Sequence, residues 1–279
     1  MRRVHLFEVG EQSWCPSALR DGLTDYLTFM IEHGQPYASA APLLATAMLR
    51  TPTPPAHVVD VVDLAAGAGG PWKVLVEALA EVGVPVRVRL TDRYPNLDAY
   101  ARLSLATNDR VTGEPRPVSA DAVPPELVGF RTMFSAFHHF APADARRVLA
   151  DAAARGRSIA IFEAMRRDVR AVLLMCLVPI FVLLSTPFIR PLRLSRLLLT
   201  YLLPVIPLVA MFDGIVSCLR TYTPAELLAI AQKSAPDGYA WTAGEVGKGP
   251  IPVTYLLLEP NAPSQQRDGG VETGRAVSS

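Results

Sequence analysis

Hydrophobic and polar residues alternate along the middle of the chain in a pattern that predicts strands and helices in turn. Short apolar, β-branched runs predict strands at 57–64, 86–91, 131–137 and 158–163, with a further short strand near 116–119. Apolar residues at helical spacing predict the intervening helices at about 72–82, 96–106 and 142–154. This alternation predicts an α/β fold with a doubly wound, mostly parallel, Rossmann-like sheet.

Both flanks of this alternating region contain predicted elements. Apolar residues at helical spacing predict a helix at 16–33. This helix either packs on the core, which is the favoured role, or contacts the substrate. Tyr26, on its apolar face, is the candidate substrate contact. A second helix is predicted at 40–50, before a proline-rich break at 51–55. Near the other end, Thr223 and Glu226 form a capping box, and two strands at 239–246 and 253–259 complete the sheet as an antiparallel pair.

An uncharged stretch interrupts the pattern after the strand at 158–163. Two runs without charge, 171–189 and 197–212, flank a basic turn that contains Arg190, Arg193 and Arg196. Nineteen helical residues reach roughly the thickness of a bilayer core, so a transmembrane hairpin is one alternative. Prolines inside the runs and arginines at the turn favour helices that lie in one leaflet on the cytoplasmic side, the arginines meeting anionic headgroups. A lid or a dimer interface is the third alternative.

These observations divide the chain into five segments. The predicted segments are an N-terminal helical cap (1–55), a Rossmann-like core (56–165), an apolar insertion after the fifth strand (166–220), a C-terminal completion of the core (221–260) and a disordered tail (261–279). We expect no signal peptide, because no apolar stretch follows Arg2 and Arg3.

Composition narrows the possible partners. Half of the 279 residues are hydrophobic, 19% are charged and the net charge is +1. A near-neutral chain gives no electrostatic support to nucleic-acid binding, whereas the apolar content makes a membrane partner plausible. The sequence does not predict an oligomeric state.

The stretch from His57 to Gly70 carries the strongest chemical signal. A buried strand ends at Asp63, and a loop of small residues then leads into a helix, an arrangement that binds nucleotide cofactors. Gly67 and Gly69 match the first two glycines of a dinucleotide fingerprint, but Trp72 stands at the third position and weighs against a nicotinamide cofactor. Asp92 ends the next strand, where an acid accepts hydrogen bonds from ribose hydroxyls.

Several segments in order resemble class I S-adenosylmethionine-dependent methyltransferases. Residues 62–69 are similar to the first motif of that family, with Ala65 where its first glycine usually stands, and 90–92 resemble its acidic second motif. Residues 119–122 are similar to the turn after the third strand, 133–140 to the fourth-strand segment that commonly ends in a His-His pair, and 158–163 to the fifth strand. Residues 212–227 resemble a segment of membrane-associated bacterial members.

The resemblance implies S-adenosylmethionine as the cofactor and a seven-stranded sheet. It implies a set of cofactor-binding residues, in which Asp121 meets the adenine amino group: Asp63, Ala65, Gly67, Gly69, Asp92, Arg93, Asp121, Ala122 and Ser135. The implied activity is methyl transfer. In this fold the loop after the fifth strand borders the acceptor cavity, so the apolar insertion there predicts a hydrophobic small molecule or a lipid-like acceptor. Oxygen is the favoured nucleophile and nitrogen is possible.

Catalysis of such a transfer requires the acceptor nucleophile, the methyl group and the sulfur to be aligned. An acceptor that is protonated at neutral pH also requires a base. His138 and His139 follow the fourth strand at the ligand-binding edge, and His139 is the favoured base, although packing roles are equally compatible with the pair. Candidate substrate-binding residues, besides Tyr26, are Glu163, Asp213, Arg220 and Tyr222. No metal-ligand motif is present, so no metal is predicted. The alternatives are a nicotinamide-dependent oxidoreductase and a non-catalytic membrane adaptor that binds the cofactor.

Overall fold

A seven-stranded sheet forms the centre of the protein. The computed structural model describes residues 1–50, 58–234, 237–247 and 252–261, and its strands run in the order β3-β2-β1-β4-β5-β7-β6. The strands are β1 (Val59–Asp63), β2 (Val86–Leu90), β3 (Val111–Gly113), β4 (Phe130–Phe134), β5 (Ile159–Glu163), β6 (Tyr239–Val246) and β7 (Val253–Pro260). The first five strands are parallel, whereas β7 is antiparallel to both β5 and β6. The predicted fold class and the antiparallel final pair are confirmed.

The register of the central strands brings their carboxyl ends together. Asp63, the last residue of β1, pairs with Leu90 of β2 and with Thr132 of β4. β5 continues the parallel ladder beside β4. The segments that follow β1, β2, β4 and β5 therefore emerge at one edge of the sheet, where ligands bind in folds of this kind.

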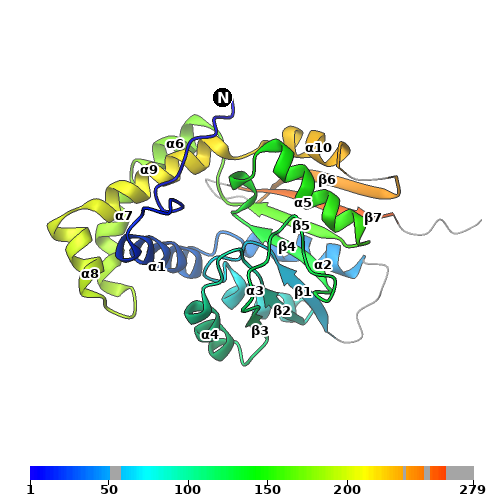
Figure 1. Ribbon diagram of the computed structural model, residues 1–279, viewed down its shortest axis with the longest axis horizontal. Coiled ribbons are helices and arrows are strands. Elements are labelled where there is room, and N and C mark those ends of the chain that lie inside the picture. The colour runs from blue at the N-terminus through cyan, green and yellow to red at the C-terminus, as the bar shows by residue number, and fades with distance from the viewer. Residues whose placement is uncertain (51–57, 235–236, 248–251, 262–279) are drawn as a thin grey trace, which may run out of the picture.

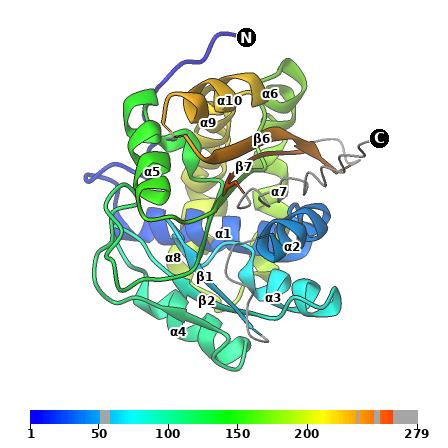
Figure 2. The ribbon, with the colours of Figure 1, turned by 90° about the vertical axis from the view of Figure 1, so that its right-hand side faces the viewer.

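Helices cover both faces of the sheet (Figure 1, Figure 2). The elements are α1 (Ser17–Gly34), α2 (Ala41–Leu49), α3 (Trp72–Glu81), α4 (Leu97–Ala106), α5 (Pro142–Ala154) and α10 (Pro224–Gln232). Side chains that alternate along a strand belong to opposite faces, so Val61 packs in the core that α2, α3 and α4 cover and Val62 in the core of α5 and α10. The predicted capping box is confirmed, because the backbone N–H of Glu226 donates to Thr223 Oγ1 and that of Thr223 to the Glu226 carboxylate.

The position of the third strand is the main correction to the predicted elements. The strand expected near 116–119 is wrong, because β3 lies earlier, at Val111–Gly113. Pro115 and Pro117 lack amide hydrogens, so that stretch cannot donate a continuous ladder. One hydrogen bond continues beside β2, from Val118 N to Asp92 O at 2.8 Å. The predicted break at 51–55, His57 and all of the predicted tail except Asn261 lie outside the described residues.

The apolar insertion forms a helical lobe beside the sheet (Figure 1). It contains α6 (Val169–Met175), α7 (Val178–Ser185), α8 (Leu194–Leu197), a π-helical turn (Leu198–Leu202) and α9 (Val205–Arg220). Residues of α1, α6, α7 and α9 share a third hydrophobic cluster, whereas α2 belongs to the sheet core. The run Val169–Phe188 is long and apolar enough to cross a membrane, and the pair Leu194–Leu202 and Val205–Arg220 passes the same test with a bend of 81°.

Candidate functional site

The loop between β1 and α3 and the end of β2 form the first half of the site. In this glycine loop (64–71), Ala65 has φ of +52° and Gly67 has φ of +54°, so the backbone turns sharply as the resemblance predicts for glycine positions. The N–H of Gly67 donates to Asp92 Oδ2 at 2.9 Å, and the N–H of Tyr94 donates to Oδ1 at 2.8 Å. The Asp92 carboxylate is therefore fixed beside the loop.

Gly69 and Trp72 explain how the loop packs on the helices. Gly69 has φ of +108°, and a Cβ there would lie 2.6 Å from Leu103 Cδ2, so a larger residue would displace the Leu103 side chain of α4. Trp72 is fully buried, and its ring meets Phe134 edge-on. The third position of the dinucleotide fingerprint is therefore filled by a core side chain.

Asp63 faces the interior of the protein. It is 1% exposed, and its Oδ1 accepts a hydrogen bond from Thr132 Oγ1 at 2.6 Å. Burial raises the pKa of this carboxyl to about 7, although the Thr132 hydrogen bond opposes the shift. The side chain ties β1 to β4 beneath the glycine loop, so its contribution to a cofactor site comes through the position of the loop.

The remaining predicted cofactor residues lie around this edge with different partners. Arg93 and Ala122 are exposed. Asp121 accepts from Ser119 Oγ at 2.6 Å and from Arg147 Nε at 3.0 Å, and these contacts lower its pKa. Ser135, with φ of +44°, contacts the Tyr37 hydroxyl and accepts from Ala164 N at 3.2 Å, which fixes the end of β4.

His138 and Glu163 form a buried pair at the second half of the site. Both side chains are at most 3% exposed. His138 Nδ1 lies 2.7 Å from Glu163 Oε2, and the backbone N–H of His138 donates to Oε1 at 3.1 Å. A carboxylate only accepts, so Nδ1 carries the proton of this contact, and in the neutral form of the ring the lone pair is on Nε2. Glu163 therefore orients His138 and does not face an acceptor.

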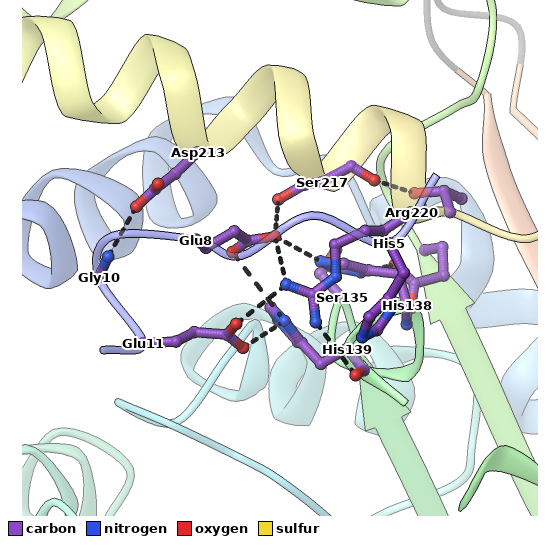
Figure 3. A network of polar contacts seen from close by, with 12 residues as sticks. His5, Glu8, Gly10, Glu11, Ser135, His138, His139, Asp213, Ser217 and Arg220 are labelled. Atoms are coloured by element: carbon purple, nitrogen blue, oxygen red, sulfur yellow. Dashed lines mark hydrogen bonds and ion pairs between the residues drawn. The ribbon is translucent and has the colours of Figure 1, made fainter. Parts of the chain in front are cut away.

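His139 meets two carboxylates from the N-terminal segment (Figure 3). Its Nδ1 lies 2.5 Å from Glu11 Oε1 and 4.0 Å from Glu8 Oε2. Arg220, on α9, lies 2.9 Å from Glu11 and 3.4 Å from Glu8, and donates to His139 O at 3.0 Å. Burial raises the pKa of Glu8, whereas His139 and Arg220 outweigh burial and lower the pKa of Glu11 to about 2.

We call this group the histidine cluster, and its members are Glu8, Glu11, His138, His139, Glu163 and Arg220. The structure thus brings together both predicted catalytic histidines and two of the predicted substrate residues. The sequence did not indicate Glu8 or Glu11, because residues 1–15 have no periodicity that predicts where their side chains point. Ser217 of α9 donates from its Oγ to Glu8 Oε1 at 2.9 Å, and it was missed because its partner lies 209 residues away along the chain.

Of the other predicted substrate residues, Asp213 and Tyr222 support the segments around the histidine cluster, whereas Tyr26 lies elsewhere. Asp213 accepts from the backbone N–H groups of Val9 and Gly10 at 2.7 and 2.9 Å, which holds the N-terminal segment in place. The Tyr222 hydroxyl donates to Phe140 O at 2.8 Å. Tyr26 packs in the third hydrophobic cluster, where burial raises its pKa to about 12.

A cavity of about 580 Å³ lies where the apolar insertion meets the glycine loop. Its lining includes Ala68 and Gly70 of the loop, Asp25 and Phe29 of α1, and Ile189 and Arg193 of the insertion. The insertion, α1 and the glycine loop therefore line one cavity together.

Comparisons with known proteins add a likeness of fold. No protein-family model and no curated protein matches the chain. Among solved structures, an O-methyltransferase family protein from Burkholderia thailandensis is 16% identical, with 91% of this chain and 62% of that chain covered and a TM-score of 0.49. NcsB1, an O-methyltransferase from neocarzinostatin biosynthesis solved with S-adenosylmethionine and 2-hydroxy-5-methyl naphthoic acid, is also 16% identical, over 80% and 57%, with a TM-score of 0.45.

A protein from Rhodobacter sphaeroides described as a zinc-dependent alcohol dehydrogenase is equally similar, at 16% identity over 78% of this chain and 89% of that chain, with a TM-score of 0.44. The chain spans about 60% of the length of the two O-methyltransferases just named. At this level of identity the likeness concerns the fold, and the chemistry has to be argued from the side chains.

Proposed function

We propose that this protein is an S-adenosylmethionine-dependent methyltransferase that acts on a hydrophobic small-molecule or lipid-like acceptor at a membrane surface. The observation that carries the proposal is the contact between Gly67 N and the Asp92 carboxylate at the carboxyl edge of the sheet. This contact holds the Asp92 carboxylate, which can accept hydrogen bonds from ribose hydroxyls, beside a tight loop whose backbone can approach a ligand closely. The buried Trp72 at the third fingerprint position supports this donor over a dinucleotide.

The histidine cluster supports an oxygen acceptor. Methyl transfer is an in-line displacement, in which the acceptor oxygen bonds to the methyl carbon as the carbon–sulfur bond breaks and the sulfonium becomes a neutral thioether. The acceptor hydroxyl must lose its proton, and His139, held by Glu11, is the candidate base that takes it and passes it to water. The remaining rate enhancement comes from alignment of donor and acceptor.

Exposed apolar side chains support the membrane surface. Residues that are more than a third exposed follow the whole insertion: Val169, Leu173, Leu177, Ile180, Phe181, Leu183, Leu184, Phe188, Leu192, Leu194, Leu198, Tyr201, Leu202, Leu203, Leu208 and Phe212. Exposed apolar area of this extent is costly in water, and burial in the headgroup region of a bilayer would remove that cost.

Contacts between α1 and the turn of the insertion favour a monotopic arrangement over a transmembrane hairpin. Arg193 lies 2.8 Å from Asp21, and Arg196 pairs with Asp25, so the turn packs against a helix of the catalytic body. A turn on the far side of a bilayer would lose these contacts. The bend of 81° within the return leg also favours a broken, surface-lying path.

The basic turn corrects one expectation from the sequence. Arg196 is 1% exposed and donates to Ile189 O and Pro191 O, so it cannot meet lipid headgroups as expected. Arg193 is held by Asp21 and Asp25, whereas Arg190 is exposed. Apolar burial therefore supplies most of the proposed membrane affinity, and binding to vesicles should depend only weakly on salt.

One experiment tests donor and acceptor together. Purified protein is mixed with S-adenosylmethionine that carries an isotope-labelled methyl group and with a lipid extract, and the extract is searched by mass spectrometry for species that gain the label. We expect label in lipophilic species with wild type and at least about tenfold less label with Asp92→Ala at a cofactor concentration below saturation. Asp60→Ala, which changes an exposed acid at the other end of β1, should behave as wild type. Absence of labelled product despite bound cofactor would contradict the proposed activity.

A further inference from the structure

Glu8, His138 and His139 bring three metal-binding atoms together beneath the N-terminal segment. One ligand atom from each lies within 4.8 Å of the other two. Glu8 and His138 are buried and His139 is 29% exposed, so the group is open on one side only. We propose that these three side chains form a binding site for one divalent transition-metal ion.

The second nitrogen of His138 points to a ligand. Among the described residues, Nε2 has no hydrogen-bond partner, although the side chain is 97% buried. Its Nδ1 is already bound to Glu163, so in the neutral form of the ring Nε2 offers its lone pair to a ligand. A buried histidine whose outer nitrogen is fixed by a carboxylate is the arrangement in which histidines bind metals, because the carboxylate sets the tautomer and increases ligand basicity.

The distances between the three side chains fit an ion better than direct hydrogen bonds. His138 Nε2 lies 3.8 Å from Glu8 Oε1, and His139 Nδ1 lies 4.0 Å from Glu8 Oε2. Both separations are too long for hydrogen bonds. Two ligands of one tetrahedral zinc ion, with bonds of about 2.0–2.1 Å, lie about 3.4 Å apart, so a small inward movement of the side chains would complete the site.

The charged side chains around the site have an excess of carboxylates, which favours binding of a cation. Three carboxylates, those of Glu8, Glu11 and Glu163, belong to the cluster, and Arg220 faces two of them. Arg3 donates to His138 O and Phe140 O at the margin. Glu11 lies 2.5 Å from His139 Nδ1, closer than two ligands of one ion would be, so it would have to move away from that nitrogen when an ion binds there. Two imidazoles with carboxylates favour zinc, iron or manganese over magnesium.

This inference rests on the proposed function for its chemical consequence, although binding of the ion does not depend on it. An ion bound to an acceptor oxygen lowers the pKa of that hydroxyl, so its proton leaves to water before the methyl group is transferred. His139 would then act as a ligand in place of a free base.

The test is isothermal titration of the chelator-treated full chain with zinc chloride, and separately with magnesium chloride. Wild type should bind one zinc ion with micromolar or tighter affinity and show no saturable binding of magnesium. Glu8→Gln, which keeps the size of the side chain, and His139→Gln should each weaken zinc binding at least about tenfold. His33→Gln, at an exposed histidine of α1, should bind zinc as wild type does. Circular dichroism and thermal melting establish that each variant is folded.

Each outcome separates this inference from the proposed function. Failure of wild type to bind zinc, or equal binding by Glu8→Gln and His139→Gln, overturns the metal site, and cofactor binding and methyl transfer by the same preparations are scored independently. Saturable zinc binding by a protein that binds no S-adenosylmethionine would uphold the metal site and reject the methyltransferase.

Discussion

The glycine loop and the histidine cluster lie at the same edge of one sheet, yet they are built differently. The loop is made by neighbouring residues and by the end of the adjacent strand, and its main contact is from Gly67 N to Asp92. The cluster gathers side chains from the N-terminal segment, the turn after β4 and the end of α9 (Figure 3), together with Glu163 at the end of β5. If the loop holds the donor and the cluster acts on the acceptor, changes in one half should leave the other largely intact.

The apolar insertion should give the largest effect. The triple variant Leu184→Ser, Leu202→Ser and Leu203→Ser removes three side chains that are each 59–71% exposed. Each buried leucine contributes about 1.5 kcal/mol or more to membrane transfer, so vesicle binding in co-sedimentation should fall about a hundredfold or more. Leu105→Ser, on α4, is the control and should bind vesicles as wild type does. Unchanged binding of the triple variant would reject the proposed membrane face.

Glu163→Ala should damage the acceptor half. It leaves the backbone N–H and Nδ1 of His138 buried without their acceptor, so the free energy of unfolding in urea should fall by about 2–4 kcal/mol. The affinity for S-adenosylmethionine should remain within about twofold of wild type, because the glycine loop is untouched. A loss of cofactor affinity as large as the loss of stability would show that the two halves are coupled.

Asp92→Ala should have the reverse effect. Charge-assisted hydrogen bonds to ribose are worth about 1.5–3 kcal/mol, so calorimetric affinity for S-adenosylmethionine should fall about 10- to 100-fold. Unfolding free energy should change by less than about 1 kcal/mol, since Asp92 is only half-buried and its partners are loop amides. Wild-type affinity in this variant would mean that the donor lies elsewhere.

Asp63 should make stability depend on pH. Its folded pKa of about 7 lies above the ordinary value, so the folded protein holds a proton there that the unfolded chain releases. Between pH 5 and 7 the wild type should therefore lose about 1–2 kcal/mol of unfolding free energy relative to Asp63→Asn, as measured in urea. Parallel pH profiles for the two proteins would contradict a buried, protonated Asp63.

Ala65→Gly should have the smallest effect. Ala65 has φ of +52°, a conformation that is strained for alanine and free for glycine. The free energy of unfolding should rise by about 0.5–1 kcal/mol, with cofactor affinity unchanged. Thermal melting measures the first quantity, and a lower melting temperature would mean that the Ala65 methyl group makes a stabilising contact.

The sequence predicted the glycine loop better than the histidine cluster, because the loop is formed by residues close together in the chain and the cluster by residues far apart. Local pattern was sufficient for β1, the loop and α3, and for the capping box at Thr223, because period and end signals lie within a few residues. β3 was misplaced because Pro115 and Pro117 interrupt the ladder in a segment that otherwise resembles a strand. Local pattern also identified the histidines that follow β4.

Long-range partners explain what the sequence could not predict. Glu8 and Glu11 meet His139 from more than a hundred residues away, and no periodicity in the first fifteen residues indicates that encounter. The sequence predicted that Arg196 contacts lipid headgroups. That prediction was wrong because Arg196 is buried and paired with Asp25, and sequence alone does not distinguish such an arginine from an exposed one.

Calorimetric titration with S-adenosylmethionine and with NAD⁺ tests the central claim most directly. The account predicts saturable, one-to-one binding of S-adenosylmethionine by wild type, weakened at least about tenfold by Asp92→Ala and unchanged by Asp60→Ala, with no saturable heat from NAD⁺. Binding of NAD⁺ in preference to S-adenosylmethionine, or an affinity for S-adenosylmethionine that is indifferent to Asp92, would contradict it.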